Sequence, residues 1–210
     1  MGKTAIFGGT FNPVHSGHLK LIEVCCKALG IEKAVLIPAN VPPHKIAKQL
    51  APNADRLAMC QLAARSLPYL SVSDMELNAE GKSYTVLTMR RLRQAFPDEK
   101  FYFVMGTDMF LSFDRWYCWQ EILDYCDICV SVRRENEYPG LERKRDELYA
   151  AYPDLRADCI HTVKADCIEI SSTALREMLE NGDSRAKQYL PEGVYDYIRE
   201  HRLYEQEKEG

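Results

Sequence analysis

Short apolar runs alternate with amphipathic stretches along the chain, and this alternation most limits how the chain can fold. The strand-like runs are Thr4–Phe7, Ala34–Ile37, Phe101–Met105, Ile128–Val132 and, more weakly, Cys159–Val163. The amphipathic stretches between them are Ser16–Leu29, Ala54–Ser66, Tyr84–Ala95, Leu141–Ala151 and Thr173–Asn181. The runs are continuously apolar, as in strands that are covered on both faces. The pattern predicts an α/β fold, with a doubly wound parallel sheet and helices on both faces.

The turn after the first strand carries the clearest chemical signal. It reads GGTFNPVHSGHL from Gly8 to Leu19, and it ends in the first turn of the next helix. Unpaired backbone N–H groups and the helix dipole make such a corner an anion site. His15 and His18 are three residues apart, so both imidazoles can face the same bound group. The segment therefore predicts a phosphate site at the carboxyl end of the first strand, where ligands bind in such sheets.

Length and charge exclude several classes of protein. A chain of 210 residues with a net charge of −4 fits one domain and argues against nucleic acid as the main partner. We expect a single domain over residues 1–210, with a helical C-terminal portion from about residue 171. The sequence has no apolar run typical of a signal peptide or a membrane span, so a cytoplasmic location without membrane contact is expected. A homo-oligomer is compatible with these properties.

Eight cysteines are present, at irregular spacings. Only Cys126 and Cys129 form a CxxC pair, which is typical of redox or zinc sites. No second CxxC or suitably spaced histidine pair accompanies it, so packing of two small side chains at a buried strand is favoured. We expect free thiols and no protein-bound metal.

A second hydroxyl-rich segment, IEISSTALRE from Ile168 to Glu177, precedes a short helix. Ser172 and Arg176 are four residues apart and share a helix face, which suits a polyphosphate. The alternative is ordinary helix capping with a solvated arginine. Together with the first corner, the segment predicts a second set of phosphate contacts.

Several segments resemble one known family. GGTFNPVHSGHL resembles the T/HxGH signature of the nucleotidyltransferase superfamily, and ISSTALR resembles its ISxxxxR signature. Further segments are similar to the bacterial nicotinate-nucleotide adenylyltransferases: PPHK from Pro42, KSYTVLTMRRL from Lys82, FVMGTDMFLSFDRWYCWQEI from Phe103 and YLPEGVYDYI from Tyr189. The matches cover almost the whole chain in order. Asn12, Met109 and the lack of an acidic residue after Ser83-Tyr84-Thr85 depart from the usual family pattern.

The resemblance implies a Rossmann-like fold of the adenylyltransferase type and transfer of AMP from ATP to nicotinate mononucleotide. The products are deamido-NAD and pyrophosphate, and Mg²⁺ is expected on the phosphates of ATP. The catalytic residues are then His15, His18, Lys45 and Arg176. The expected ATP-binding residues are Gly8, Gly9, Thr10, Phe11, His15, His18, Gly106, Asp108, Arg133, Ile170, Ser172 and Arg176. A mononucleotide phosphate is already largely ionised at neutral pH, since its second pKa is about 6, so no general base is required.

The resemblance places the nicotinate ring near Trp116 and Tyr117 and its carboxylate at backbone N–H groups around Thr85. The expected mononucleotide-binding residues are Lys45, Ser83, Tyr84, Thr85, Trp116 and Tyr117. Core packing is the alternative for the two aromatic residues, and a surface ion pair is the alternative for Arg133. The long proline-rich segment Pro38–Pro52, which carries Lys45, is typical of a binding loop or lid.

Three other functions compete with this interpretation. One is another superfamily enzyme, such as an adenylyltransferase of the phosphopantetheine type, and one is a sensor that binds NAD-like ligands. The third, a fragment of a class I aminoacyl-tRNA synthetase, is set aside because the chain lacks room for a tRNA-binding domain and a basic surface. Two intact histidines in the first motif favour an enzyme over a sensor.

Overall fold

The computed structural model describes residues 2–41, 49–165 and 168–205, and it has a six-stranded sheet at its centre. The strands are β1 (Lys3–Gly9), β2 (Lys33–Pro38), β3 (Leu70–Val72), β4 (Lys100–Gly106), β5 (Cys126–Val132) and β6 (Ile160–Lys164). Every neighbouring pair is parallel, in the order β3-β2-β1-β4-β5-β6. The predicted doubly wound sheet is confirmed. The three-residue edge strand β3 was not predicted.

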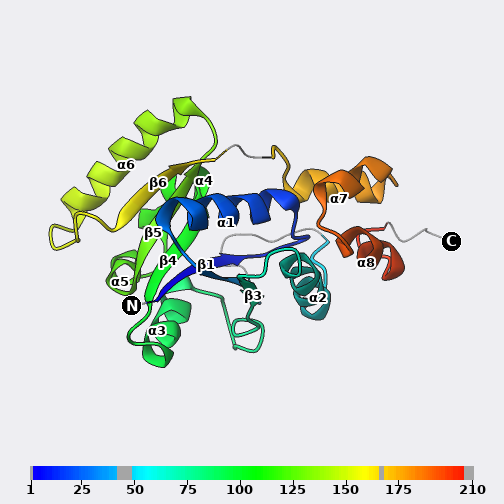
Figure 1. Cartoon of the computed structure of the whole chain (residues 1–210), viewed down its shortest axis with the longest axis horizontal. Helices are drawn as coiled ribbons and strands as arrows, with labels where there is room; N and C mark the ends of the chain where they lie inside the picture. Colours follow the sequence, from blue (N-terminus) through cyan, green and yellow to red (C-terminus); the bar gives the residue numbers. More distant parts are fainter. Residues whose placement is uncertain (1, 42–48, 166–167, 206–210) are drawn as a thin grey trace.

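Helices cover both faces of the sheet (Figure 1). They are α1 (Ser16–Leu29), α2 (Asn53–Ala64), α3 (Thr85–Ala95), α4 (Thr107–Leu111), α5 (Trp119–Tyr125), α6 (Tyr138–Ala151), α7 (Ser172–Glu180) and α8 (Val194–Glu200). Short 3₁₀ turns lie at η1 (Phe113–Arg115), η2 (Glu135–Glu137) and η3 (Ser184–Tyr189). The predicted bounds of α1 are confirmed, whereas the short helices α4 and α5 were not predicted. No helix of the described ranges is long and apolar enough to cross a membrane.

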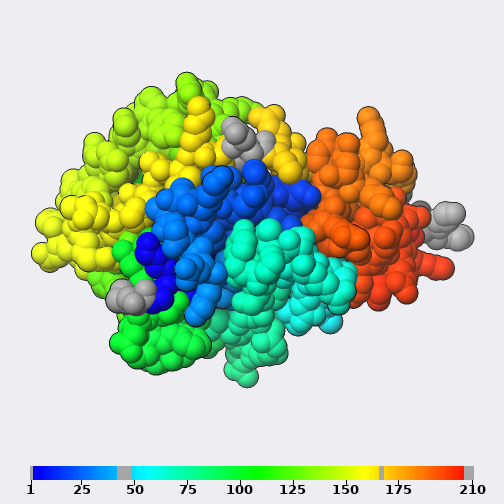
Figure 2. Space-filling view, in the orientation of Figure 1, coloured from blue at the N-terminus to red at the C-terminus, as the bar shows by residue number. Residues whose placement is uncertain are grey.

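Alternation along each strand divides the core into two layers. In β1, Ala5 and Phe7 pack with α1, α2, α7 and α8, whereas Ile6 packs with α3, α4, α5 and α6 on the other face. The whole of β5 is buried, as expected for a central strand with helices on both sides. Figure 2 shows the first face, where α1 in blue meets α2 and the orange segment around α7. This packing brings the C-terminal helices beside the first helix.

The cysteines of the CxxC pair belong to this core. Cys126 and Cys129 are buried free thiols in β5. Burial raises the pKa of Cys126, and a hydrogen bond with Cys25 together with burial raises the pKa of Cys129. Both therefore stay protonated, which is the inert form of a structural thiol, and the packing interpretation is confirmed. The other described cysteines are also free; Cys167 lies outside the described residues.

Candidate active site

A cavity of about 1410 Å³ opens at the carboxyl ends of β1 and β4. The sheet order reverses between these two strands, so their following turns lead to opposite faces and leave a crevice. The predicted residues that line it are Gly8, Gly9, Thr10, Phe11, His15, His18, Ser83, Tyr84, Thr85, Gly106, Asp108, Trp116, Tyr117, Arg133, Ile170, Ser172 and Arg176. The remaining predicted residue, Lys45, lies outside the described residues, as do residues 42–48 of the Pro38–Pro52 segment. Both signature corners thus share one cavity.

The two histidines of the first corner are held against each other. His15 is the N-cap residue of α1, and its backbone N–H donates to Nδ1 of His18 over 3.1 Å. The two rings stack with centroids 3.6 Å apart. Because Nδ1 of His18 accepts a hydrogen bond, the neutral ring carries its proton on Nε2. Nε2 of His18 is therefore a hydrogen-bond donor.

His15 is almost completely buried, with 4% of its surface exposed. Burial, and then the positive charge of Arg133, lower the pKa of His15 to about 4. Its Nδ1 has no hydrogen-bond partner among the described residues. A Cβ at Gly17 would lie 3.0 Å from that nitrogen, which explains the glycine between the two histidines. His15 is a neutral imidazole near pH 7.

The second corner is hydrogen-bonded directly to the first. The Ser172 hydroxyl donates to the Pro13 carbonyl over 3.0 Å, and Nη1 of Arg176 donates to the Asn12 carbonyl over 2.8 Å. Capping of α7 falls to Ser171, whose Oγ accepts from the backbone N–H of Ala174. The capping alternative therefore holds for Ser171. Ser172 and Arg176 instead join two segments that are far apart in the sequence.

The side chain of Asn12 anchors the first corner to two more segments. Its Oδ1 accepts from the Ala51 N–H over 3.0 Å and from the Tyr204 hydroxyl over 2.8 Å, and its Nδ2 donates to the Gln49 carbonyl over 3.0 Å. The amide uses its donor and its acceptor at once, which a carboxylate cannot do. Sequence reasoning missed Tyr204, because nothing local links it to a turn 192 residues earlier.

The aromatic part of the cavity lies beside the start of α3. Trp116 packs edge-on against Phe103, with ring centroids 5.9 Å apart, and is partly buried. Tyr117 is 57% exposed and contacts Tyr84, with centroids 4.9 Å apart. The core-packing alternative therefore holds for the side of Trp116 that contacts Phe103. Trp116 and Tyr117 both line the cavity as well.

The N-terminus of α3 faces this aromatic part. Its N-cap residue, Tyr84, makes no side-chain capping bond. The Ser83 hydroxyl accepts from the Asn40 N–H over 3.0 Å. Glu76, which was not predicted, is buried in the cavity wall and accepts from the Thr88 hydroxyl over 2.5 Å. Burial raises its pKa, and the hydroxyls of Thr88 and Ser83 oppose that rise.

Gly106, Asp108 and Arg133 line the part of the cavity beyond β4 and β5. Gly106 is the N-cap residue of α4, and a Cβ there would meet nothing within 4 Å. The Arg133 N–H donates to Oε2 of Glu137 over 3.1 Å, so Glu137 fixes the end of β5. Among the described residues, no ion pair involves Arg133, which argues against the surface-pair alternative. The same ranges contain no cluster of three or more His, Cys, Asp or Glu side chains able to hold a metal.

Comparisons with known proteins agree with this geometry. The family model described as cytidylyltransferase-like matches residues 6–178. A protein of Dehalococcoides mccartyi is 37% identical over 96% of this chain and 97% of its own length. One of Acidithiobacillus ferrooxidans is 41% identical over 95% and 94%, respectively. Both are named probable nicotinate-nucleotide adenylyltransferases.

A solved structure has the same fold at low sequence identity. The Plasmodium falciparum nicotinic acid mononucleotide adenylyltransferase, complexed with NaAD, superimposes with a TM-score of 0.75 at 16% identity. The match covers 97% of this chain and 98% of that one. Such a likeness supports the fold of the sheet and its helices over the full length.

Proposed function

The chain belongs to the nicotinate-nucleotide adenylyltransferases, and from this membership we propose that it transfers AMP from ATP to nicotinate mononucleotide. The products are deamido-NAD and pyrophosphate. The observation that carries the proposal is the meeting of both phosphate-binding corners at one cavity, joined by the Ser172–Pro13 and Arg176–Asn12 hydrogen bonds. The proposal places the enzyme in the cytoplasm.

In the proposed reaction, a phosphate oxygen of the mononucleotide attacks the α-phosphorus of ATP. The new bond joins that oxygen to the α-phosphorus, and the bond to the β-phosphate bridging oxygen breaks, which releases pyrophosphate. The nucleophile is already ionised, since its second pKa is about 6, so the protein need not remove a proton. Alignment of the two anions and stabilisation of the charge on the leaving group remain as the tasks of the site.

The first corner has donors suited to those tasks. Nε2 of His18 carries a proton and lies at the cavity, and Arg176 adds a positive charge from α7. His15 is neutral near pH 7, so we assign it to the shape of the corner and to hydrogen bonding rather than to charge. Lys45 keeps its predicted role as a phosphate donor. Mg²⁺ enters with ATP as part of the substrate, held by phosphate oxygens and water.

The aromatic part of the cavity is assigned to the acceptor. The exposed face of the Trp116–Tyr117 pair suits stacking of the pyridine ring. The N–H groups at the start of α3, which no side chain caps, suit the carboxylate of nicotinate. This pairing of a carboxylate with a helix N-terminus favours the acid over the amide. Gly106, Asp108 and Arg133 are assigned to the adenosine half of ATP.

The test of the reaction is an acceptor series with ATP and Mg²⁺, monitored by pyrophosphate release. We expect turnover with nicotinate mononucleotide, much less with nicotinamide mononucleotide, and none with phosphopantetheine. Turnover only with phosphopantetheine would assign the chain to another branch of the superfamily. Tight binding of deamido-NAD with no turnover on any acceptor would favour the sensor.

Replacing Trp116 tests the acceptor site separately. Trp116→Ala removes the stacking surface, which is worth about 1–3 kcal/mol for a base on an aromatic ring. We expect KM for nicotinate mononucleotide to rise about tenfold while KM for ATP stays within twofold. Trp119→Phe, in the buried core beside it, is the control for altered aromatic packing. An unchanged acceptor KM would remove Trp116 from the site.

A further inference from the structure

Arg56 is a completely buried cation that contacts neutral oxygens. It lies in the first turn of α2 with no exposed surface. Its Nη1 donates to the Thr10 carbonyl over 2.8 Å, and its Nε donates to the Ala51 carbonyl over 3.2 Å. Its Nη2 donates to Oδ1 of Asn53 over 2.5 Å. No ion pair in the described ranges includes Arg56.

This arrangement differs from that of Lys144 and Asp127, two other buried charges. The buried Lys144 pairs with Asp114 over 2.7 Å, and the buried Asp127 accepts from the cations Lys100 and Arg156 and from the ring of His161. A guanidinium stays protonated in proteins, and burial of an unpaired charge costs several kcal/mol. Burial lowers the pKa of Arg56, as expected for a cation without a carboxylate beside it. Its charge is therefore available to an anion nearby.

Arg56 contacts a turn that lines the cavity. Thr10 and Phe11 line the cavity, whereas Arg56 does not. In a trans peptide the C=O and N–H point in opposite directions, so holding the Thr10 carbonyl on the Arg56 side turns the Phe11 N–H away from it. The Asn12 and Pro13 carbonyls are likewise held, by Arg176 and Ser172. Three carbonyls of one turn are thus occupied by protein donors and kept from a bound anion.

We propose that Arg56 is a positioning residue for polyphosphate binding. It holds the Thr10 carbonyl out of the cavity, and its buried positive charge attracts the bound polyphosphate, which compensates that charge. This inference rests on the proposed function, because the triphosphate of ATP is the anion in question. Arg56 also donates to the carbonyl of Ala51, which lies just before α2, so it fixes Ala51 relative to the turn.

The test compares three variants by calorimetric titration with ATP at several salt concentrations. Arg56→Gln removes the charge and the fork of donors, and Arg56→Lys keeps the charge alone. Arg65→Gln, at the C-cap of the same helix and exposed, is the control. We expect Arg56→Gln to weaken ATP binding at least tenfold and to flatten its salt dependence. Arg56→Lys should keep the salt dependence with a several-fold loss of affinity, and Arg65→Gln should match the wild type.

Two results would overturn the inference. One is a folded Arg56→Gln protein whose ATP affinity and salt dependence equal those of the wild type. The other is an Arg56→Lys protein whose KM values for ATP and nicotinate mononucleotide change equally or not at all. This second result tests the inference even when the Arg56→Gln protein does not fold. Failure of the proposed function would give a different result. ATP binding would still depend on Arg56, but the wild type would release no pyrophosphate with any acceptor.

Discussion

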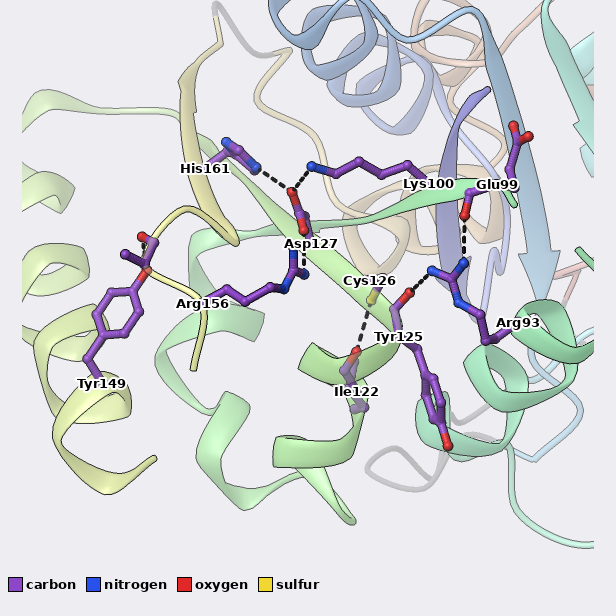
Figure 3. A network of polar contacts seen from close by, with 11 residues as sticks. Arg93, Glu99, Lys100, Ile122, Tyr125, Cys126, Asp127, Tyr149, Arg156 and His161 are labelled. Carbon is purple, nitrogen blue, oxygen red and sulfur yellow. Dashed lines mark hydrogen bonds and ion pairs between the residues drawn. The ribbon is translucent and has the colours of Figure 1, made fainter. Parts of the chain in front are cut away.

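The protein treats two buried charges differently. Asp127 lies at the amino ends of the strands, here called the amino edge, and Arg56 lies beside their carboxyl ends, the carboxyl edge. At the amino edge, Asp127 of β5 accepts from Lys100 over 2.8 Å, from Arg156 over 2.7 Å and from His161 over 2.9 Å (Figure 3). At the carboxyl edge, Arg56 contacts only neutral oxygens. A charge that the protein itself neutralises stabilises the fold. A charge left without a counter-ion beside a cavity is available to a ligand.

The pKa of Asp127 reflects the first arrangement. Burial alone would raise it, but the hydrogen bonds from His161, Lys100 and Arg156 outweigh burial and lower the pKa to about 2. The surrounding polar groups are also satisfied within the protein: Arg93 donates to the carbonyls of Glu99 and Tyr125 (Figure 3). Within the described part of the chain, no buried side-chain polar atom at this edge lacks a hydrogen-bond partner.

The largest expected effect separates catalysis from binding at the carboxyl edge. His18→Ala removes the Nε2 donor, and loss of one preorganised donor typically costs about 2.7–4 kcal/mol in the transition state. We expect kcat to fall by roughly 10²–10³ while Kd for ATP changes only a few-fold. His201→Ala, an exposed histidine at the end of α8, is the control. Equal losses in kcat and ATP binding would make His18 a structural residue.

The next effect belongs to the amino edge and should leave the reaction unchanged. Asp127→Asn leaves the cations Lys100 and Arg156 beside a neutral amide, and breaking a buried pair costs about 3 kcal/mol at the lower end of the usual range. For a chain of this size that corresponds to a fall in Tm of roughly 6–12 °C. We expect kcat and both KM values to stay at wild-type levels at 20 °C. A loss of activity in the folded variant would break the contrast between the two edges.

Acidification distinguishes the two edges, because His15 at the carboxyl edge and Asp127 at the amino edge change the stability of the fold in different pH ranges. His15 has a pKa of about 4 when folded and 6.5 when unfolded, so the unfolded chain binds more protons in between and stability falls as pH drops through that range. Between pH 7 and 5 the loss due to His15 is about 2 kcal/mol. Asp127 contributes nothing there, since its lowered pKa matters only below about pH 4.

Urea unfolding of the wild type and His15→Asn at pH 7, 6 and 5 measures this difference. Asparagine is a good N-cap residue and does not titrate, so the variant should show the shallower pH dependence. Parallel curves for the two proteins would mean that His15 is not held neutral by the fold.

The smallest effect concerns the anchor of the first turn. Tyr204→Phe removes one hydrogen bond to Asn12 and should lower the free energy of unfolding by about 1 kcal/mol, with a several-fold fall in kcat/KM for ATP. Tyr197→Phe is the matched control, because its hydroxyl donates to Asp55 of α2 over 2.8 Å and not to the turn. It should lose similar stability and keep kcat/KM. A fall in kcat/KM in both variants would indicate general loosening of the C-terminal helices.

Local patterns were enough to predict the sheet, most helices and the two corners. The glycine turn and the histidine spacing are contiguous in the sequence, and the three-residue β3 is too short to show a pattern. The supports of the site were missed for a different reason. Arg56 donates to two backbone carbonyls, which every residue possesses, and its four-residue spacing from Cys60 fits an ordinary helix. Glu76 lies in an irregular connection, where no periodicity indicates burial.

The hydrogen bond between Tyr204 and Asn12 can form only late in the synthesis of the chain. The turn that carries Asn12 is synthesised early, and the Tyr204 hydroxyl that bonds to it is added 192 residues later. At about 5–20 residues per second, translation needs on the order of 10–40 s to cover that interval. Until Tyr204 has been added, the turn lacks this hydrogen bond. The hydrogen bonds of the Asn12 turn are thus complete only when the C-terminal segment packs against it.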